Sequence, residues 1–455
     1  MYHQIQLKNI EGGRFMNRIH RGKWFVLVFV VLGSLFLLYG CGEKKQAKTQ
    51  SDVVEVRFGY PGGVGDYETI KNKIIPLFEE AHPDIKIKLE YQPWNQFWTK
   101  LKTQIAAGDA PDFWVSDGVY FMEYADRGAL RDLTEWVKRD FDQKDFFALD
   151  FASSPDGRIW GIPREIQTIA LYYNKDSFDD VGLSYPDKTW DWNTLLKNAK
   201  KLTRDTNGDK KIDQYGFWST SWISGGTFNF IYQNKGRILD ETRTKSMLDQ
   251  PEAIEAIQYM VDLVLKHKVS PTDEISSSVG GSNAIFQAKV VAMYPNNYAM
   301  SSAFNQSKDL NYDSAVLPKG KVRAASYNAI PIVINSKATD QKAEAAWEFI
   351  KFFAHSEKVQ KIWSEGGFGI PILKKVVYSK SFVDAPTKPS NKSAFIEPLE
   401  EGYGLPMDLN KCWNEWRVAL SENLSLAWLG HTSAEKAMLK AHKDVQRILD
   451  NAFAK

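Results

Sequence analysis

Beyond residue 52 the chain alternates between the apolar spacing typical of strands and the spacing typical of helices. Apolar side chains at every second position predict strands, and apolar side chains three or four residues apart predict helices. The expected order is a strand at 54–58, a loop at 59–63, a helix at 70–81 ended by Pro83, a strand at 85–89, a helix at 97–105 ended by Gly108 and a strand at 113–115. This βαβαβ order predicts a parallel, doubly wound sheet with helices on both faces.

The same patterns continue along the rest of the chain. We expect a strand pair at 159–173, helices at 194–203, 251–266 and 343–355, strands at 315–318 and 329–334, and a last helix that starts at Thr432. Thr432 and Glu435 have the Ser/Thr-x-x-Glu spacing of a capping box, which predicts where that last helix begins. The pattern contains no internal repeat, so a solenoid is not expected.

The segment 16–41, MNRIHRGKWFVLVFVVLGSLFLLYGC, has a different character. A basic head that includes Arg18 and Lys23 precedes an uncharged run, and the run ends at Gly40-Cys41 before a polar tether at 42–52. This resembles a bacterial lipoprotein signal peptide, in which Cys41 would be lipidated and begin the mature chain at the membrane. An uncleaved membrane anchor is the alternative, although the uncharged run is shorter than the roughly 20 residues of a spanning helix. Tyr39 is unusual before Gly-Cys, and Met16 is the expected initiator.

Composition narrows the classes of protein and partner. The net charge is +2 and charged residues are 25%, so neither nucleic acid nor a strongly acidic surface is expected as a partner. With Cys41 lipidated, Cys412 is the second of only two cysteines, and no disulfide framework is available. The length suggests two or three domains and a sizeable core.

The chain is rich in aromatic residues, with 15 Trp, 19 Tyr and 26 Phe. A buried indole N–H needs a partner, so tryptophan is rarely mere filler. Five tryptophans lie in polar or glycine-rich surroundings: Trp94, Trp114, Trp222, Trp413 and Trp416. This indicates an aromatic-lined pocket, and ordinary core packing remains the alternative for each.

Five segments in a fixed order carry a resemblance to a known family. They are Ile105-Ala-Ala-Gly-Asp-Ala-Pro-Asp112 with Phe113-Trp-Val-Ser-Asp117, Gly161-Ile-Pro-Arg-Glu165 with Leu171-Tyr-Tyr-Asn-Lys-Asp176, Phe286-Gln-Ala-Lys-Val-Val-Ala-Met293, 329–336 with the helix at 343, and 367–371. Each segment is weak alone, but their order and spacing resemble the extracellular solute-binding proteins of sugar ABC transporters, family 1, the maltodextrin-binding group.

The resemblance implies an α/β, two-lobed periplasmic-binding-protein fold of type II, with lobes joined by crossover strands and a ligand cleft between them. It implies a first lobe at 53–164 plus 319–366 and a second lobe at 165–318 plus 367–455. The function it implies is binding, without catalysis, of a carbohydrate, with an oligosaccharide favoured. The closed form would dock on ABC permease subunits. We expect a lipid-anchored, extracytoplasmic monomer that binds no nucleic acid.

Sugar hydroxyls pair with carboxylates and amides, and aromatic rings cover sugar faces. The resemblance places acidic residues at Asp117 and Glu165, a stacking ring at Trp222 and a departure from the usual pattern at Asn297-Tyr298. The expected ligand-binding residues are Trp94, Trp114, Asp117, Glu165, Trp222, Asn297, Tyr298 and Trp413. An exposed loop Asp and packed aromatic rings are the alternatives.

A second oxygen-rich motif lies between the predicted helix at 194–203 and the strands that follow. Asp205, Asn207, Asp209 and Asp213 fall at positions 1, 3, 5 and 9 of a calcium-like loop, with the carbonyl of Lys211 at position 7. Glycine falls at position 4, and position 12 lacks the usual glutamate. We expect a structural Ca²⁺ and no catalytic cofactor, with a solvated turn as the alternative.

Two other classes of protein remain open. A secreted glycoside hydrolase also needs aromatic rings and two carboxylates, a role that Asp117 and Glu165 resemble. The sequence lacks the repeated strand–helix units of a (β/α)₈ barrel. The seven histidines are scattered, which argues against a transition-metal receptor.

Overall fold

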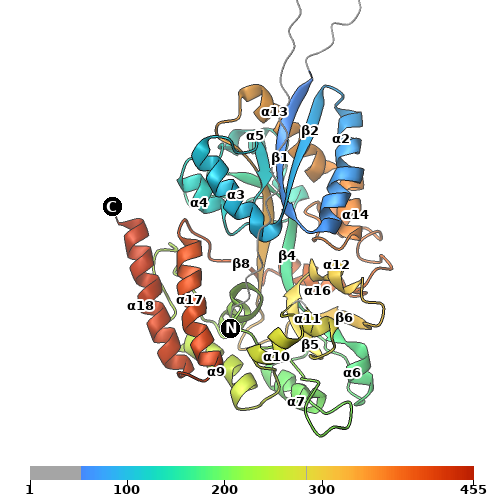
Figure 1. Ribbon diagram of the computed structural model, residues 1–455, viewed down its shortest axis with the longest axis vertical. Helices are drawn as coiled ribbons and strands as arrows, with labels where there is room; N and C mark the ends of the chain where they lie inside the picture. Colours follow the sequence, from blue (N-terminus) through green and yellow to red (C-terminus); the bar gives the residue numbers. More distant parts are fainter. Residues whose placement is uncertain (1–52, 283, 455) are drawn as a thin grey trace, which may run out of the picture. The chain divides into compact units, whose positions relative to one another are not determined.

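A computed structural model describes residues 53–282 and 284–454 of the chain. The predicted signal segment, the lipidation site Cys41 and the tether at 42–52 lie outside the described residues. In the described part, one eight-stranded sheet has the strand order β2-β1-β3-β7-β4-β5, with β6 paired to β4 and β8 to β7. Figure 1 shows helices on both sides of this sheet.

The first half of the sheet confirms the predicted βαβαβ unit. Strands β1 (Val54–Gly62), β2 (Ile85–Pro93) and β3 (Phe113–Val115) are parallel. The predicted loop at 59–63 is wrong, because β1 continues through its buried end to Gly62. The first predicted helix is α1 (Val64–Thr69) joined through a π-helical turn, η1 (Ile70–Ile74), to α2 (Ile75–Ala81).

Helix α3 (Trp94–Ala107) begins earlier than its apolar spacing predicts and ends as expected. Its C-cap is Gly108 in the left-handed conformation, with φ of 75°. Glycine adopts this conformation without a steric penalty, so the helix stops at this residue. The turn then leads directly into β3 and the residues that follow it.

Strand β4 (Gly161–Asn174) connects the two parts of the sheet, and all of its residues are buried. The prediction of a strand pair at 159–173 is wrong, since this is one continuous strand. Its first half pairs antiparallel with β7 (Ala325–Ile334), and its second half pairs with β5 (Met293–Asn297) and β6 (Tyr312–Ala315). β4 and β7 are therefore the crossover strands of a type II solute-binding fold.

A third crossing segment accompanies β4. Ile166 and Ile370 exchange two backbone hydrogen bonds, of 3.0 and 3.1 Å between N and O. The predicted lobe boundaries fall within β4, ahead of β7 and immediately ahead of this third segment. The exact boundaries stay a prediction, but the crossings that motivate them are present.

The other predicted helices form close to their expected positions. They are α7 (Trp192–Leu202), α9 (Pro251–Leu265), α13 (Asp340–His355) and α18 (Ala434–Phe453). The capping prediction is wrong by one residue, because Ser433, not Thr432, accepts the backbone N–H of Lys436. The strand expected at 315–318 ends at Ala315. Helix α17 (Trp413–Trp428) packs alongside α18, and both are drawn in red in Figure 1.

Shorter elements complete the described chain. They are α4 (Phe121–Asp126), α5 (Thr134–Asp140), η2 (Gln143–Asp145), α6 (Lys175–Asp179), η3 (Ile223–Thr227), α8 (Phe228–Gln233), α10 (Asp273–Ser278), α11 (Ala284–Gln287), α12 (Met300–Phe304), α14 (Glu357–Glu365), α15 (Lys374–Val377), α16 (Ser393–Glu400) and β8 (Gly404–Pro406). Among residues 53–282 and 284–454, no helix combines the length and apolar character needed to cross a membrane.

Candidate ligand-binding site

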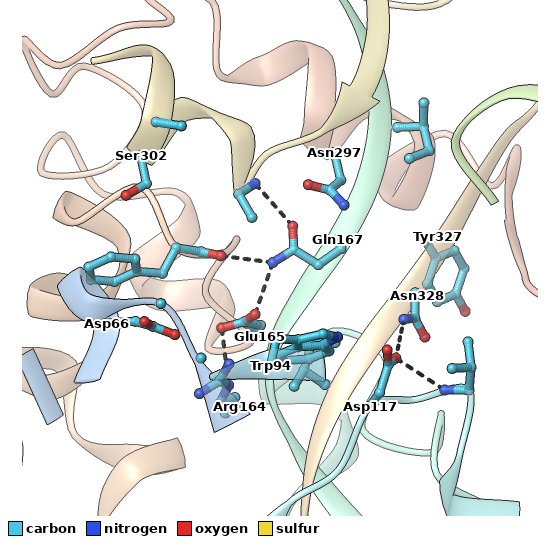
Figure 2. A pocket seen from close by; sticks show the side chains of 18 of the residues that line it. Asp66, Trp94, Asp117, Arg164, Glu165, Gln167, Asn297, Ser302, Tyr327 and Asn328 are labelled. Carbon is cyan, nitrogen blue, oxygen red and sulfur yellow. Dashed lines mark hydrogen bonds and ion pairs between the residues drawn. The ribbon is translucent and has the colours of Figure 1, made fainter. Parts of the chain in front are cut away.

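A cavity of about 910 Å³ opens where the crossover strands meet the loops that follow β1, β3 and β5. Its walls come from segments far apart in the sequence, and Figure 2 shows many of their side chains converging on it. The polar and aromatic lining includes Asp66, Trp94, Asp117, Tyr120, Arg164, Glu165, Gln167, Trp222, Asn297, Tyr327, Asn328, Trp413 and Arg417. The structure thus brings together six of the eight predicted ligand-binding residues: Trp94, Asp117, Glu165, Trp222, Asn297 and Trp413.

Three of the lining side chains are tryptophans from separate elements. Trp94 opens α3, Trp413 opens α17, and Trp222 precedes the π-turn η3. Trp222 is 39% exposed, a high value for an indole ring, so much of its surface is free to cover a ligand. Its ring lies against Gly225, where an added Cβ would come within 1.7 Å of the Trp222 ring. Glycine at 225 is therefore required for this ring position.

Trp413 has a second feature that points to a ligand. It is 2% exposed and packs edge-to-face with Trp416, with ring centroids 4.5 Å apart. Its indole Nε1 has no hydrogen-bond partner within the described residues. The Oδ1 atom of Asn297, on β5, is likewise buried and unpaired. Both residues line the cavity, so a ligand bound there can supply hydrogen-bond partners for these two atoms.

Two predicted ligand-binding residues belong to the core, and the structure corrects both. Trp114, in the middle of β3, is 0% exposed and packs edge-to-face with Tyr124. Tyr298 is 1% exposed and packs against Phe382 and Phe395. Neither lines the cavity. Trp416, which the sequence singled out on its surroundings, is also fully buried.

Asp117 follows β3 and is half-buried in the cavity wall. Its Oδ1 accepts hydrogen bonds from Asn328 Nδ2 at 3.0 Å and from the backbone N of Val119 at 3.2 Å. Its Oδ2 accepts none from the described residues. Burial raises the pKa of Asp117, while the Asn328 and Val119 bonds lower it. Asp117 is therefore held at one oxygen and available at the other.

Glu165 is positioned by an irregularity in β4. The pairing register with β7 shifts between Pro163 and Glu165, which leaves Arg164 as the extra residue of a β-bulge. A bulge bends the strand and redirects side chains, so adjacent Arg164 and Glu165 both line the cavity. Gly369, on the third crossing segment, makes room for them, because a Cβ there would lie 2.5 Å from the Glu165 Cβ.

Glu165 is bound on both carboxylate oxygens. Oε1 accepts from Gln167 Nε2 at 2.9 Å, and Oε2 accepts from Trp363 Nε1 and pairs with Arg164 Nε at 3.3 Å. Arg164 also donates to the Tyr60 hydroxyl at 2.8 Å. We name Tyr60, Arg164, Glu165, Gln167 and Trp363 the crossover cluster. Burial raises the pKa of Glu165, and Arg164 opposes that rise.

Gln167 extends the crossover cluster to both neighbouring segments. Its Nε2 donates to the Phe368 carbonyl at 2.8 Å, and its Oε1 accepts from the Ala299 backbone N at 3.2 Å. Phe368 lies on the third crossing segment, and Ala299 precedes α12. One side chain on β4 therefore joins three segments at the floor of the cavity, as Figure 2 shows.

Sequence reasoning missed several lining residues, including Asp66, Arg164, Gln167, Asn328 and Arg417. Arg164 and Gln167 lie next to the predicted Glu165, and Arg417 lies one helical turn after Trp413, so local spacing could have suggested them. Asp66 and Asn328 had no such signal. Asp66 lies in the first turn of α1, and its Oδ2 accepts a hydrogen bond from the Tyr60 hydroxyl at 3.2 Å.

The oxygen-rich loop at 205–213 is largely exposed, and none of its residues lines this cavity. Asp205 accepts backbone N–H groups of Asn207, Gly208 and Lys210, and Asp213 accepts from Thr206. Within the described residues, no three His, Cys, Asp or Glu side chains gather closely enough to hold a metal ion. The Oδ1 atoms of Asn207, Asp209 and Asp213 likewise accept bonds from the loop's own backbone N–H groups and the Thr206 hydroxyl. Calcium stays a prediction from the sequence.

Known proteins of similar sequence and structure agree with this architecture. The maltotriose-binding protein of Pyrococcus abyssi is 24% identical over 379 residues, which cover 81% of this chain and 74% of that protein. A solved ABC substrate-binding protein of Listeria monocytogenes in complex with cycloalternan has a TM-score of 0.77 and 28% identity, covering 87% of this chain and 99% of that one. The maltose-bound MalE3 of T. maritima has a TM-score of 0.72 and 25% identity, covering 87% and 99%.

A family model also matches about two thirds of the chain. The model of the bacterial extracellular solute-binding proteins matches residues 62–360, which include β2, β3, both crossover strands and most of the cavity wall. The five sequence segments, the crossings and the cavity between them are the features that this family implies. The chain belongs to the bacterial extracellular solute-binding proteins.

Proposed function

We propose that this protein binds an oligosaccharide in the cavity at its crossover strands and delivers it to the permease subunits of an ABC importer. One observation carries the proposal: three tryptophans and two carboxylates, Asp66 and Asp117, converge on a single cavity. Aromatic faces suit the C–H faces of sugar rings, and carboxylates suit their hydroxyls. The ligands named for the relatives, maltotriose, cycloalternan and maltose, support the same class.

The size of the cavity favours several sugar units over one. Its volume of about 910 Å³ is near the upper end of the roughly 300–1,000 Å³ typical of small-molecule sites. Trp94 and Trp222 come from different elements and are at least partly exposed, so they can cover different units of one chain. The lining holds Arg164 and Arg417 against Asp66, Asp117 and Glu165, and this near balance favours a neutral sugar.

Binding is tested directly by the tryptophans themselves. Intrinsic fluorescence and calorimetric titrations with maltotriose, cellotriose, arabinotriose and a uronate trimer are expected to give saturable binding for a neutral oligosaccharide. Mass spectrometry of ligand released from freshly purified protein would identify the natural sugar. Silence across all four trimers together with no co-purified carbohydrate would overturn the proposal.

We propose binding without cleavage. A glycoside hydrolase needs a proton donor and a second free carboxylate across the scissile bond. Both oxygens of Glu165 are bound by Gln167, Trp363 and Arg164, so Glu165 is poorly placed to be the second group. Chromatography of each trimer after prolonged incubation is expected to show intact sugar, and shorter products would revive the hydrolase.

We also propose that Cys41 carries a lipid anchor that keeps the binding protein near its permease. The basic head, the uncharged run and Gly40-Cys41 support this. Mass spectrometry of the N-terminal peptide from membrane fractions is expected to show acylated Cys41 and no peptide from residues 16–40. Recovery of residues 24–39 in the mature protein would show a retained helix instead of a lipid.

A further inference from the structure

We propose that Asn328 is a positioning residue for sugar recognition, which holds the Asp117 carboxylate by one oxygen so that the other can accept sugar hydroxyls. This inference deepens the proposed function and rests on it for the sugar. Asn328 lies on crossover strand β7, and Asp117 lies in the loop after β3. Asn328 Nδ2 donates to Asp117 Oδ1 at 3.0 Å, and no described residue donates to Oδ2 (Figure 2).

The close approach of these two segments depends on Gly118. A Cβ at position 118 would come within 2.2 Å of both Asn328 Oδ1 and the Ala329 carbonyl. Glycine next to Asp117 therefore lets the loop lie directly against β7. The hydrogen bond from Asn328 can form because this position has no side chain.

The orientation of the Asn328 amide is set by its partner. Asp117 Oδ1 acts as a hydrogen-bond acceptor, as its bond from the Val119 backbone N shows. The Asn328 amide therefore turns its NH₂ group, and not its oxygen, toward Asp117 Oδ1. Asn328 Oδ1 is then left buried without a hydrogen-bond partner. An unpaired buried acceptor is unfavourable, so packing alone does not explain an asparagine here. A hydrogen bond to an ionised carboxylate does explain it.

The charged and titratable groups around Asp117 come from three other places. Arg417 on α17 and Arg164 on β4 both favour the ionised carboxylate, but neither forms an ion pair with Asp117 among the described residues. Tyr120 follows Asp117 in its own loop, and burial, followed by the nearby Asp117 carboxylate, raises the pKa of Tyr120. Among residues 53–282 and 284–454, Asn328 therefore provides the one side-chain hydrogen bond to Asp117 from a segment outside its own loop.

A ligand-free experiment tests the positioning. Asn328→Leu keeps the size of the side chain and removes the donor, so the pKa of Asp117 rises further above its unfolded value. The variant should then melt below wild type by roughly 2–4 °C at about pH 8, with the gap closing toward about pH 4 as Asp117 protonates. In an Asp117→Asn background the pH-dependent gap should vanish. Asn297→Leu, the same substitution elsewhere in the cavity, is the control and should show no coupling to Asp117→Asn.

Titrations with the trimer that wild type binds test the link to sugar. Asn328→Leu is expected to weaken affinity roughly 10–100-fold at neutral pH, and the pH at which acidification abolishes binding should move upward. A melting deficit of equal size at all pH values, unchanged by Asp117→Asn, would show a packing role and overturn the inference. A melting deficit that depends on Asp117, together with a sugar affinity equal to that of wild type, would also overturn the inference. If wild type binds no trimer, the proposed function fails and with it the sugar role, while the melting series still decides the positioning.

Discussion

The crossover cluster and other residues of the cavity wall use the same kinds of side chain but differ in their hydrogen bonds and exposure. In the cluster, Glu165 has donors on both oxygens, and Gln167 uses both ends of its amide. On the wall, Asn297 and Trp413 have buried atoms without partners, and Trp222 is 39% exposed. A satisfied carboxylate or amide stabilises the fold, and an unsatisfied one is ready for a ligand. Within the cavity wall, hydrogen-bond satisfaction therefore distinguishes residues of the same type, although it is no general rule, since Nε1 of the core residue Trp114 is also unpaired.

The largest expected effect on stability comes from the crossover cluster, in which Glu165 has hydrogen-bond donors on both oxygens. Glu165→Ala leaves Arg164 buried without its carboxylate, which is expected to lower the free energy of unfolding by about 3–5 kcal/mol. Denaturant unfolding measures this. Glu165→Gln is the matched control, since its amide oxygen still accepts from Trp363, and a smaller loss is expected. A stable Glu165→Ala protein with only weakened sugar binding would place Glu165 with the ligand-binding residues.

Two tryptophans, one buried and one exposed, allow stability and sugar binding to be compared directly. Trp416→Ala removes a ring that is 0% exposed and is expected to destabilise the protein by about 3–5 kcal/mol. Trp222→Ala is expected to cost less than about 1 kcal/mol in stability but to weaken sugar affinity about tenfold or more. Thermal melts and calorimetric titrations of both variants separate the two roles. If Trp222→Ala loses stability and keeps its affinity, the exposed ring is structural.

These two residues also show what could be predicted from sequence. Periodicity located β1, β2, β3 and the C-terminal ends of α2 and α3, because each depends on local spacing and on Pro83 or Gly108. It could not separate Trp222 from Trp416, because both lie among polar residues and only tertiary packing decides their exposure. Nor could it separate Asn297 from Tyr298, of which only the first lines the cavity.

Strand β4 shows which part of the fold could not be predicted from the sequence. Pro163 and two charged residues interrupt the apolar run at 159–173, which favoured two strands over one. The structure resolves the interruption as a bulge in one buried strand, with Arg164 as its extra residue. The charges are tolerated because Tyr60 and Trp363, far away in sequence, satisfy them. Partners this far away in the sequence leave no pattern near β4. The sequence therefore predicted that Glu165 lies at the site, but not that its carboxylate is held by other side chains of the protein.

The contribution of Asp66, a carboxylate of the cavity wall, to the free energy of unfolding is expected to depend on pH. Burial raises its pKa, although Arg164 and the Tyr67 backbone N–H oppose the rise. A raised pKa means that its stabilising contribution is complete below the unfolded value of 3.8 and is lost as pH rises through the folded value. The stability of wild type relative to Asp66→Asn is therefore expected to fall with rising pH across this window. Unfolding of both proteins from about pH 3 to about pH 7 measures it, and a flat difference would show that Asp66 is freely solvated.

The smallest expected effect lies in the loop at 205–213, outside the cavity. There the hydrogen bonds that the loop oxygens accept from the loop itself can be compared with their binding of calcium. Asp205 accepts three backbone N–H groups, so Asp205→Ala is expected to lower the melting temperature by roughly 1 °C. Chelation of calcium by EDTA should lower it less, since the loop's own amides already occupy these oxygens. Melts of wild type and Asp205→Ala, each with excess Ca²⁺ and with EDTA, compare the two changes. A larger effect of EDTA on wild type, abolished by Asp205→Ala, would instead show that the loop binds calcium and rearranges its oxygens to do so.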